Sequence, residues 1–119
     1  MIKAMILAAA ALTMGTAADA QTMIQKNDIK VENHLMTPEA LWAMGRIGGA
    51  EASPNGKQVV YQVGYYSVKE NKGHQMLFIM DANGKNKKAL TTDAKSETDA
   101  AWIQGGQKIA FIRDGQLWS

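Results

Sequence analysis

The sequence has 119 residues, a formal net charge of +2 and no cysteine, and 46% of its residues are hydrophobic. The length indicates one domain at most. The small charge argues against nucleic-acid binding, and the absence of cysteine excludes disulfides, cysteine-based zinc sites and a lipid-modified cysteine anchor.

Residues 1–20 differ in composition from the rest of the chain. A lysine near the start precedes an apolar run over Ala4–Gly15, and Ala18-Asp19-Ala20 has the small-x-small pattern that a signal peptidase requires. The run is shorter than the roughly 20 residues of a transmembrane helix. We therefore predict a secretory signal cleaved between Ala20 and Gln21, an exported protein and no stable membrane anchor. A buried N-terminal helix is the alternative.

An extended leader over residues 21–36 is expected to precede a short helix and its connection over residues 37–47. Thr37 can cap the helix with its hydroxyl, Pro38 fits the first helical position, and Glu39 favours the positive end of the helix dipole. The apolar side and the C-terminal stop of this helix are expected at Leu41, Trp42, Met44 and Gly45.

Residues 48–119 show the pattern of β-structure, in which β-branched and aromatic runs alternate with turn residues. Asn83-Gly84 is expected to supply both positive φ values of a hairpin turn, and Glu97 and Asp99 are expected in a polar turn. The predicted strands are Val59–Val63, Met76–Met80, Lys87–Thr91, Ala100–Ile103, Lys108–Ile112 and Gln116–Trp118.

Two stretches of the β-region repeat one pattern. At an offset of 50 positions the matching residues are Gly56 with Gly106, Val59 with Ile109, and Tyr61 with Phe111. The next strand matches at an offset of 40, through Leu77-Phe78 and Leu117-Trp118. The ten-residue difference predicts a longer hairpin loop in the first unit, over Gly64–His74.

A repeat of this length with several short strands is typical of a β-propeller blade. We therefore predict a mainly β fold, with about one blade and the start of a second over residues 48–119. Since a closed propeller needs about four to eight blades, the sequence is expected to be an N-terminal fragment. A chance similarity of two glycine turns is the alternative.

The stretches MTPEALWAMGRIGGAEASPNGKQVVYQV, LFIMDANGKNKKALT and AAWIQGGQKIAFIRDGQLW resemble the start of secreted bacterial peptidases of the prolyl oligopeptidase family. The resemblance is to the dipeptidyl-peptidase and acylaminoacyl-peptidase branch. Ser53-Pro54-Asn55-Gly56-Lys57 is similar to the family's Ser-Pro-Asp-Gly-Lys repeat, and Ile103–Gln107 is a degenerate copy.

This resemblance implies a propeller that caps an α/β-hydrolase domain, which is absent from this sequence and cleaves short peptides with a Ser-Asp-His triad. The segment would gate access to that domain, and the peptide substrate would bind through it. TolB-like propellers share the repeat motif, so a non-catalytic periplasmic propeller that binds protein partners is the alternative.

No residue of this sequence is assigned a catalytic role, and no cofactor or metal site is predicted. None of the serines lies in Gly-x-Ser-x-Gly, and His34 and His74 are interpreted as a leader residue and a loop residue. Tyr65 and Tyr66, on the predicted loop, are the candidates for substrate binding, with packing on the base of the loop as the alternative. The tryptophans at 42, 102 and 118 are interpreted as packing residues.

Overall fold

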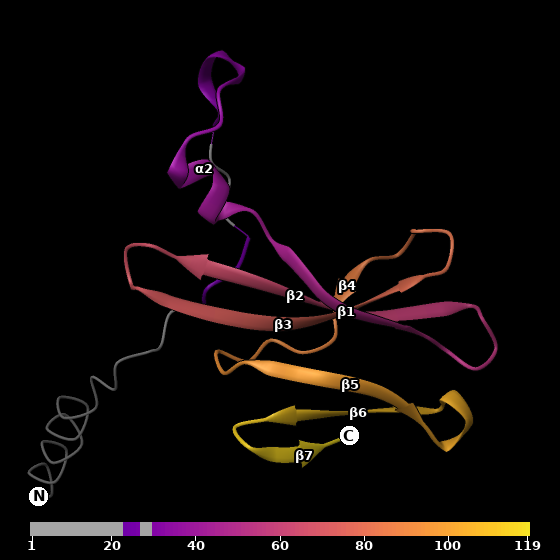
Figure 1. The fold of residues 1–119 in the computed structure, drawn as a ribbon. Helices are drawn as coiled ribbons and strands as arrows, with labels where there is room; N and C mark the ends of the chain where they lie inside the picture. Colours follow the sequence, from indigo (N-terminus) through magenta and orange to yellow (C-terminus); the bar gives the residue numbers. More distant parts are fainter. Residues whose placement is uncertain (1–22, 27–29) are drawn as a thin grey trace, which may run out of the picture.

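The computed structural model describes residues 23–26 and 30–119, so the predicted signal and its cleavage between Ala20 and Gln21 lie outside the described residues. The fold is mainly β, as predicted, with two antiparallel sheets (Figure 1). The first sheet has the strand order β1-β2-β3-β4 and the second has β5-β6-β7. Both sheets are open, and the described residues form no closed barrel or propeller.

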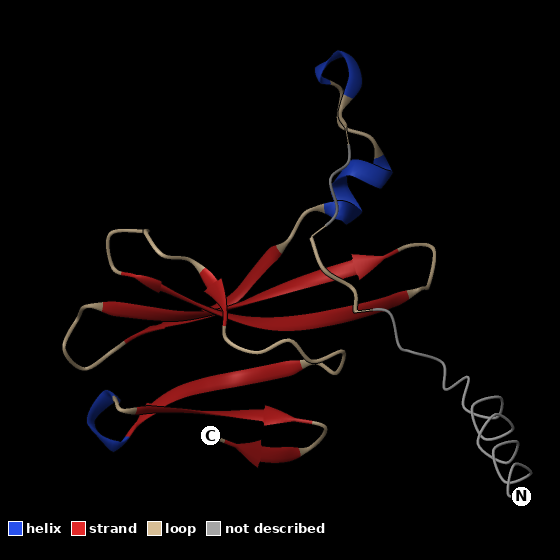
Figure 2. Ribbon diagram, turned by 180° about the vertical axis from the view of Figure 1, so that it is seen from behind, coloured by secondary structure: helices blue, strands red, loops and turns tan. Residues whose placement is uncertain are grey.

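Within residues 23–26 and 30–119, helical structure is limited to short segments: η2 and α2 stand apart from the sheets, and η3 lies at the turn between β5 and β6 (Figure 2). In chain order the elements are η2 (Glu32–His34), α2 (Pro38–Ala43), β1 (Arg46–Ala52), β2 (Gln58–Ser67), β3 (Lys72–Asp81), β4 (Lys88–Ala89), β5 (Glu97–Ile103), η3 (Gln104–Gly106), β6 (Lys108–Arg113) and β7 (Gln116–Trp118).

Both ends of α2 lie where the sequence predicts them. The Ala40 N–H donates to Thr37 Oγ1 at 3.1 Å, and Pro38 is the first helical residue. The helix ends at Ala43 with Met44 as its C-cap, so Gly45 directly follows the cap, where a stop glycine is expected, although it lacks the positive φ of a glycine cap. Gly45 instead permits a close approach, since a Cβ there would lie 2.8 Å from side-chain atoms of both Val63 and Tyr65.

Strand β1 follows at once and was not predicted, because its Gly48-Gly49 pair gives a weak strand pattern. Pairing with β2 decides its conformation, from Arg46 opposite Gly64 to Ala52 opposite Val59. The leader also departs from the prediction, because it contains the 3-10 turn η2 in place of a uniformly extended chain.

The predicted hairpin loop over Gly64–His74 is wrong. Strand β2 continues to Ser67 and β3 begins at Lys72, so the loop shortens to Val68–Asn71. The polar residues of this stretch gave a loop pattern, but cross-strand pairing extends the ladder through them.

The turn at Asn83-Gly84 is only partly as expected, because of these two residues only Gly84 has positive φ, at 85°.

The repeat is visible in the strand registers. In the first two strands of each sheet, Ala52 opposite Val59 corresponds to Trp102 opposite Ile109 at the same offset of 50. In the next pair, Tyr61 opposite Phe78 corresponds to Phe111 opposite Trp118. The extra residues of the first sheet therefore lengthen its hairpin: twelve residues, Gly64–Gln75, replace the two residues Asp114 and Gly115.

Each sheet has two faces, because side chains alternate along a strand and directly opposed residues share a face. We call the face of the first sheet that carries Val60, Gln62, Leu77 and Ile79 its front face, and the face that carries Val59, Tyr61, Phe78 and Met80 its back face. At the matching positions, the second sheet has Ala110, Ile112 and Leu117 on its front face and Ile109, Phe111, Arg113 and Trp118 on its back face.

The two sheets stack front to back. On the front face of the first sheet, Val60 and Leu77 are each only 1% exposed. On the back face of the second sheet, Phe111 is also buried. The indole N–H of Trp102 donates to the Glu51 carbonyl at 3.0 Å and joins β5 to β1. This stacking forms one part of the core of the described chain. Val63 and Met76, on the back face of the first sheet, are also buried, at 8% and 6% exposed.

Candidate functional site

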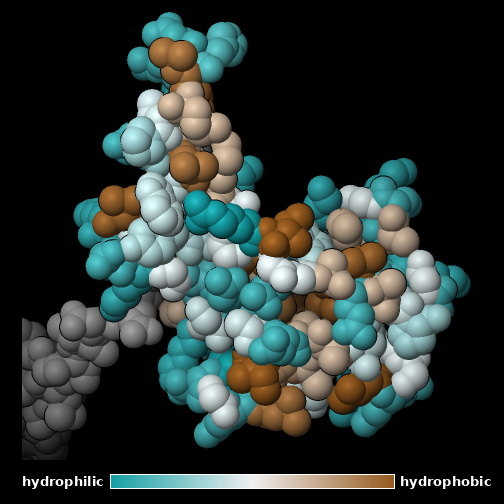
Figure 3. Space-filling view, viewed as in Figure 1, coloured by the Kyte–Doolittle hydropathy of each residue, from teal (hydrophilic) through white to brown (hydrophobic). Residues whose placement is uncertain are grey.

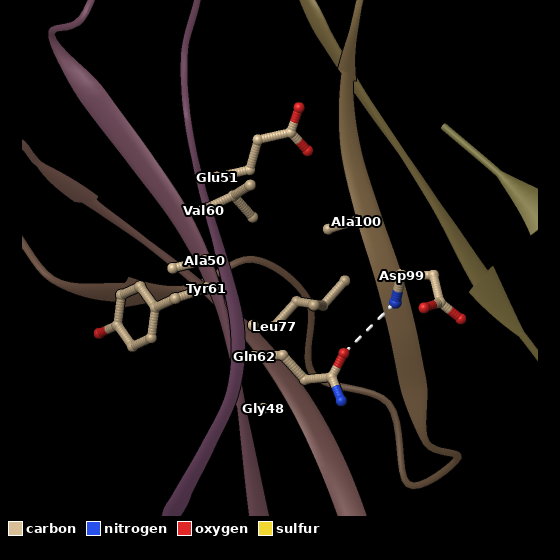
Figure 4. A pocket seen from close by; sticks show the side chains of 10 residues that line it. Gly48, Ala50, Glu51, Val60, Tyr61, Gln62, Leu77, Asp99 and Ala100 are labelled. Atoms are coloured by element: carbon tan, nitrogen blue, oxygen red, sulfur yellow. Dashed lines mark hydrogen bonds between the residues drawn. The ribbon is translucent and has the colours of Figure 1, made fainter.

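A cleft separates the front face of the first sheet from β5 (Figure 4). Val60, Gln62 and Leu77 point across it toward Asp99 and Ala100, and Tyr61 points the opposite way. The cleft has a volume of about 330 Å³ and is lined by Gly48, Gly49, Ala50, Glu51, Val60, Tyr61, Gln62, Leu77, Asp99 and Ala100.

Gln62 is the polar centre of this cleft. Its Oε1 accepts a hydrogen bond from the Asp99 N–H at 3.3 Å, and its Nε2 donates to Gln75 Oε1 at 3.1 Å. Asp99 has φ of 56°, within the interval where the pairing of β5 and β6 shifts register. The prediction that Glu97 and Asp99 form a polar turn is wrong, because both residues belong to β5.

The chemistry available in the cleft is hydrogen bonding. Glu51 and Asp99 offer carboxylates at its rim, and both residues are exposed. Such groups accept hydrogen bonds from amide and ammonium groups. The side chains that line the cleft include no hydroxyl or imidazole besides the Tyr61 phenol, which points away. The cleft can therefore accept hydrogen bonds, and its lining contains no serine nucleophile.

The two tyrosines proposed from the sequence lie on strand β2, not on a loop, and outside the cleft. They are consecutive strand residues, so their side chains project from opposite faces. Tyr65 packs against Gly45, and partial burial raises the pKa of its phenol, with a further upward contribution from Tyr61. A role in substrate binding stays a prediction for both tyrosines.

Tyr66 belongs to an aromatic cluster next to α2. Its ring centroid is 5.0 Å from that of Trp42, and its hydroxyl donates to Asn71 Oδ1. The Arg46 guanidinium lies over the Trp42 ring, 5.1 Å from its centroid. A hollow of about 180 Å³ beside this cluster is lined by Glu39, Trp42, Ala43, Tyr66, Ser67, Val68 and Lys69.

His74 is a buried strand residue, so its interpretation as a loop residue is wrong. It is 3% exposed and faces Tyr65 across the ladder. Its Nδ1 lies 2.6 Å from the Ile24 carbonyl oxygen, and its Nε2 lies 3.2 Å from the Lys95 carbonyl oxygen. The imidazole therefore connects β3 to Ile24 in the leader and to Lys95 in the segment between β4 and β5. It has no serine partner. His34 is exposed in η2, in agreement with its interpretation as an exposed leader residue.

A buried ion pair lies on the back face of the second sheet and was missed in the sequence. Glu97 is 2% exposed, and its Oε1 accepts hydrogen bonds from the Thr91 hydroxyl and from Arg113 Nη2, the latter at 3.1 Å. The offset of 50 places these two charges where the first sheet has Ile47 and Val63. That substitution of an apolar pair by an opposite-charge pair was the available clue.

The serine hydroxyls with hydrogen bonds in the described chain serve turns and strand ends. Ser53 Oγ donates to Asn55 Oδ1 at 2.7 Å, Ser67 Oγ accepts from the Glu70 N–H at 3.2 Å, and Ser96 Oγ accepts from the Gln75 N–H at 3.0 Å. Over residues 23–26 and 30–119, no group of three or more His, Cys, Asp or Glu side chains is placed to hold a metal ion. No helix in that part of the chain is long and apolar enough to cross a membrane.

The chain is similar to two proteins that are both named dipeptidyl-peptidase 5. The one from Porphyromonas endodontalis is 43% identical over 81 residues, which make up 68% of this chain and 12% of the relative. The one from Porphyromonas gingivalis is 35% identical over 77 residues, or 65% of this chain and 11% of the relative. The chain matches part of a dipeptidyl peptidase.

The chain spans only about an eighth of the length of these dipeptidyl-peptidase relatives. No family model matches it. The relation to the dipeptidyl peptidases thus agrees with the resemblance found in the repeat motifs, while the propeller and the prolyl oligopeptidase family remain predictions.

Proposed function

We propose that this chain is the propeller segment at the amino-terminal side of an exported serine peptidase that acts on short peptides. The observation that carries the proposal is the match of about two thirds of the chain to two proteins named dipeptidyl-peptidase 5. Within such an enzyme the segment restricts which peptides reach a hydrolase domain that lies elsewhere in the protein.

The repeat supports a propeller as the architecture of the segment. Its two sheets have matching registers and stack front to back, which is how the blades of a propeller cover one another. A single small sheet cannot bury both of its faces, so repeated stacking is its means of forming a core. A propeller placed over a hydrolase site leaves a narrow path, so it admits short, extended peptides and excludes folded chains.

The proposed site of action is outside the cytoplasm. The small-x-small pattern at Ala18-Asp19-Ala20 supports export, followed by cleavage before Gln21. Mass spectrometry of the protein recovered from the periplasm or medium tests this directly. A mature N-terminus at Gln21 is expected, and an intact Met1 terminus in the exported protein would contradict the cleavage.

The nucleotide sequence beyond codon 119 gives the first test of the peptidase proposal. We expect further propeller repeats and then a Gly-x-Ser-x-Gly motif within an alternating α/β pattern. Further repeats followed by a stop codon, with no such motif, would favour the non-catalytic TolB-like propeller instead.

Activity gives the second test. The protein translated from the complete gene is expected to release a chromogenic amine from dipeptidyl substrates, and replacement of the motif serine by alanine should abolish that release. The 119-residue chain serves as the matched control and should release none. Hydrolysis by the 119-residue chain, or none by the complete protein, would contradict the proposal.

A further inference from the structure

The tripeptide Asn-Gly-Lys occurs twice in the first sheet, in two turns at the same end of it. Asn55-Gly56-Lys57 lies between β1 and β2, and Asn83-Gly84-Lys85 lies between β3 and β4. The two turns are neighbours, because the Ala82 N–H donates to the Lys57 carbonyl at 2.8 Å (Figure 1). Hydrophilic side chains, drawn in teal, are visible at this end of the sheet (Figure 3).

The two turns also share their backbone hydrogen bonds. The Gly56 N–H donates to the Ser53 carbonyl at 2.8 Å, and the Gly84 N–H donates to the Asp81 carbonyl at 2.9 Å. In each turn the asparagine Oδ1 accepts from the lysine N–H, at 2.9 Å in both cases. Both glycines have positive φ. The same three residues therefore stand in closely similar local conformations.

An asparagine that precedes glycine is open to deamidation, because glycine has no side chain to hinder the approach of its nitrogen. The glycine nitrogen attacks the asparagine Cγ, the new C–N bond closes a cyclic imide, and the side-chain nitrogen leaves as ammonia with the displaced amide proton. Water then opens the imide. Cleavage of the new bond gives aspartate, and cleavage of the original peptide C–N bond gives isoaspartate. The only co-reactant is water.

In the folded chain the Asn55 side chain is held from several sides. Ser53 Oγ donates to Asn55 Oδ1 at 2.7 Å, and Ser53 is itself 6% exposed. Pro54 fixes φ within the turn, and its ring lies against Gly106 of the second sheet. To reach the cyclic imide, Asn55 must therefore release the Ser53 hydroxyl as well as the Lys57 N–H, within a turn that is restrained by its proline.

Asn83 has fewer restraints. Ala82 precedes it where the first turn has a proline, so no ring fixes the backbone of this turn. Asp81 stands where the first turn has a serine, and its carboxylate accepts from Asn86 Nδ2 at 2.6 Å and has no proton to donate to Asn83. Among the described residues, the Asn83 side chain is held by the Lys85 N–H alone. Asn83 is also exposed, so water reaches it.

We propose that Asn83 is a site of spontaneous deamidation and that its twin, Asn55, is protected by the Ser53 hydroxyl and the rigid turn. Either product places a carboxylate beside Lys85. Isoaspartate also adds one main-chain atom between residues 83 and 84, which lengthens the turn and displaces the Gly84 N–H from its carbonyl partner. The proposal is independent of the peptidase proposal and of any further repeats.

The experiment incubates the purified chain at mildly alkaline pH and follows each asparagine by mass spectrometry after digestion with trypsin. Cleavage at lysine and arginine separates the two asparagines into the peptides Ile47–Lys57 and Gly73–Lys85. Exchange of the amide for an acid raises the mass of the affected peptide. In the folded chain we expect Asn83 to convert several times faster than Asn55. The Ser53 hydrogen bond alone accounts for about 2-fold to 13-fold, which corresponds to about 0.5–1.5 kcal/mol.

Unfolding and a serine variant test whether the fold sets this ratio. In concentrated urea both asparagines should convert at the same rate, because each is followed by the same two residues and the turns are lost. Ser53→Ala removes the extra hydrogen bond and should speed the conversion of Asn55 in the folded chain. Ser67→Ala, at the opposite end of the sheet, is the matched control and should leave the ratio unchanged.

Conversion of Asn55 at least as fast as that of Asn83 in the folded chain would overturn the proposal. So would a preference for Asn83 that persists unchanged in urea, or a folded chain in which Asn83 stays intact long after it has converted in urea. An unchanged Asn55 rate in folded Ser53→Ala would overturn protection by Ser53. Circular dichroism establishes whether this variant folds, and if it does not, the wild-type rates with and without urea decide alone.

Discussion

Gly106 lies directly against Pro54: a Cβ added to this glycine would stand 3.1 Å from Pro54 Cδ. The two residues belong to the corresponding turns of the two sheets, so the stacked sheets touch at their turns as well as at their faces. The corresponding glycine of the first turn, Gly56, has no heavy atom within 4 Å of such a Cβ. Two glycines that match in sequence thus have different surroundings.

This difference predicts unequal effects for the same substitution at the two turns. Both glycines have positive φ, 71° at Gly56 and 93° at Gly106, so alanine costs about 1–2 kcal/mol at either site for backbone strain. Gly106→Ala should cost more than Gly56→Ala because it also displaces Pro54. Urea unfolding measures both changes. The added cost should vanish when Pro54→Ala is present, and equal effects of the two single variants would contradict the close contact.

For the buried pair of Glu97 and Arg113, we expect the double variant to be more stable than either single variant. Their side chains are 3% and 14% exposed. Arg113→Val leaves the Glu97 carboxylate buried without an ion-pair partner, at a cost of about 3–5 kcal/mol. Glu97→Ile should cost less, because Arg113 Nη1 also lies 3.6 Å from Asp93 Oδ2. The first sheet has Ile47 and Val63 at these positions. We expect Glu97→Ile with Arg113→Val to unfold at a higher urea concentration than either single variant, and a double variant less stable than both would contradict this.

We expect His74 to hold the leader against the β2–β3 hairpin through its contact with Ile24. His74→Leu removes the ring nitrogens that face the carbonyl oxygens of Ile24 and Lys95, so it should destabilise the chain by about 0.5–1.5 kcal/mol for the hydrogen bond that is lost. It should also speed proteolytic cleavage near residues 23–26, as followed by mass spectrometry. His34→Leu, at an exposed histidine, is the control and should change neither property.

The hydrogen bond from Trp102 to the other sheet should contribute to the stability of the chain. Trp102→Phe keeps an aromatic ring but removes the N–H that donates to the Glu51 carbonyl, so the free energy of unfolding should fall by about 0.5–1.5 kcal/mol. Trp42→Phe is the matched control, because the contacts of Trp42 are made by its ring, with Tyr66 and Arg46. Equal losses for the two variants would show that the bond contributes nothing measurable.

The raised pKa of Tyr65 predicts a loss of stability in alkali. Burial favours the neutral phenol, with a further contribution from Tyr61, so the folded chain binds the proton more tightly than the unfolded chain does. The stabilisation is complete below the pKa of 10.0 that an exposed tyrosine has, and it is lost as the pH rises through the folded value. Absorbance at alkaline pH should show a late-titrating tyrosine that Tyr65→Phe removes and Tyr66→Phe retains.

Much of the β-region could be predicted because its signals are local. Val59–Val63 and Met76–Met80 are short apolar runs bounded by turn residues, and each lies within an observed strand. The matching of Tyr61 with Phe111 and of Leu77-Phe78 with Leu117-Trp118 identified residues that occupy equivalent positions in the strand pairs of the two sheets. Repetition carries this information because two copies that fold alike keep similar residues at equivalent positions.

Long-range pairing decided what the sequence signals missed. Strand β1 contains Gly48-Gly49 and has weak strand propensity, yet it forms because β2 offers it a complete edge. The polar hairpin around Tyr65 and Tyr66 is a ladder for the same reason, and the two tyrosines consequently lie outside the cleft. His74 and Glu97 are polar residues in polar stretches, and only their partners, distant in the chain or across the sheet, explain their burial.

The sequence by itself determined the strand-forming runs, the turn glycines and the repeat, since each of these depends on residues close together in the chain or on comparison of one stretch with another. Only the tertiary structure decided which face of each sheet is buried, where the hairpin turns, and which polar side chains are enclosed. Those features depend on what a distant segment contributes, and the free energy of a face or a buried charge is set by the surface packed against it.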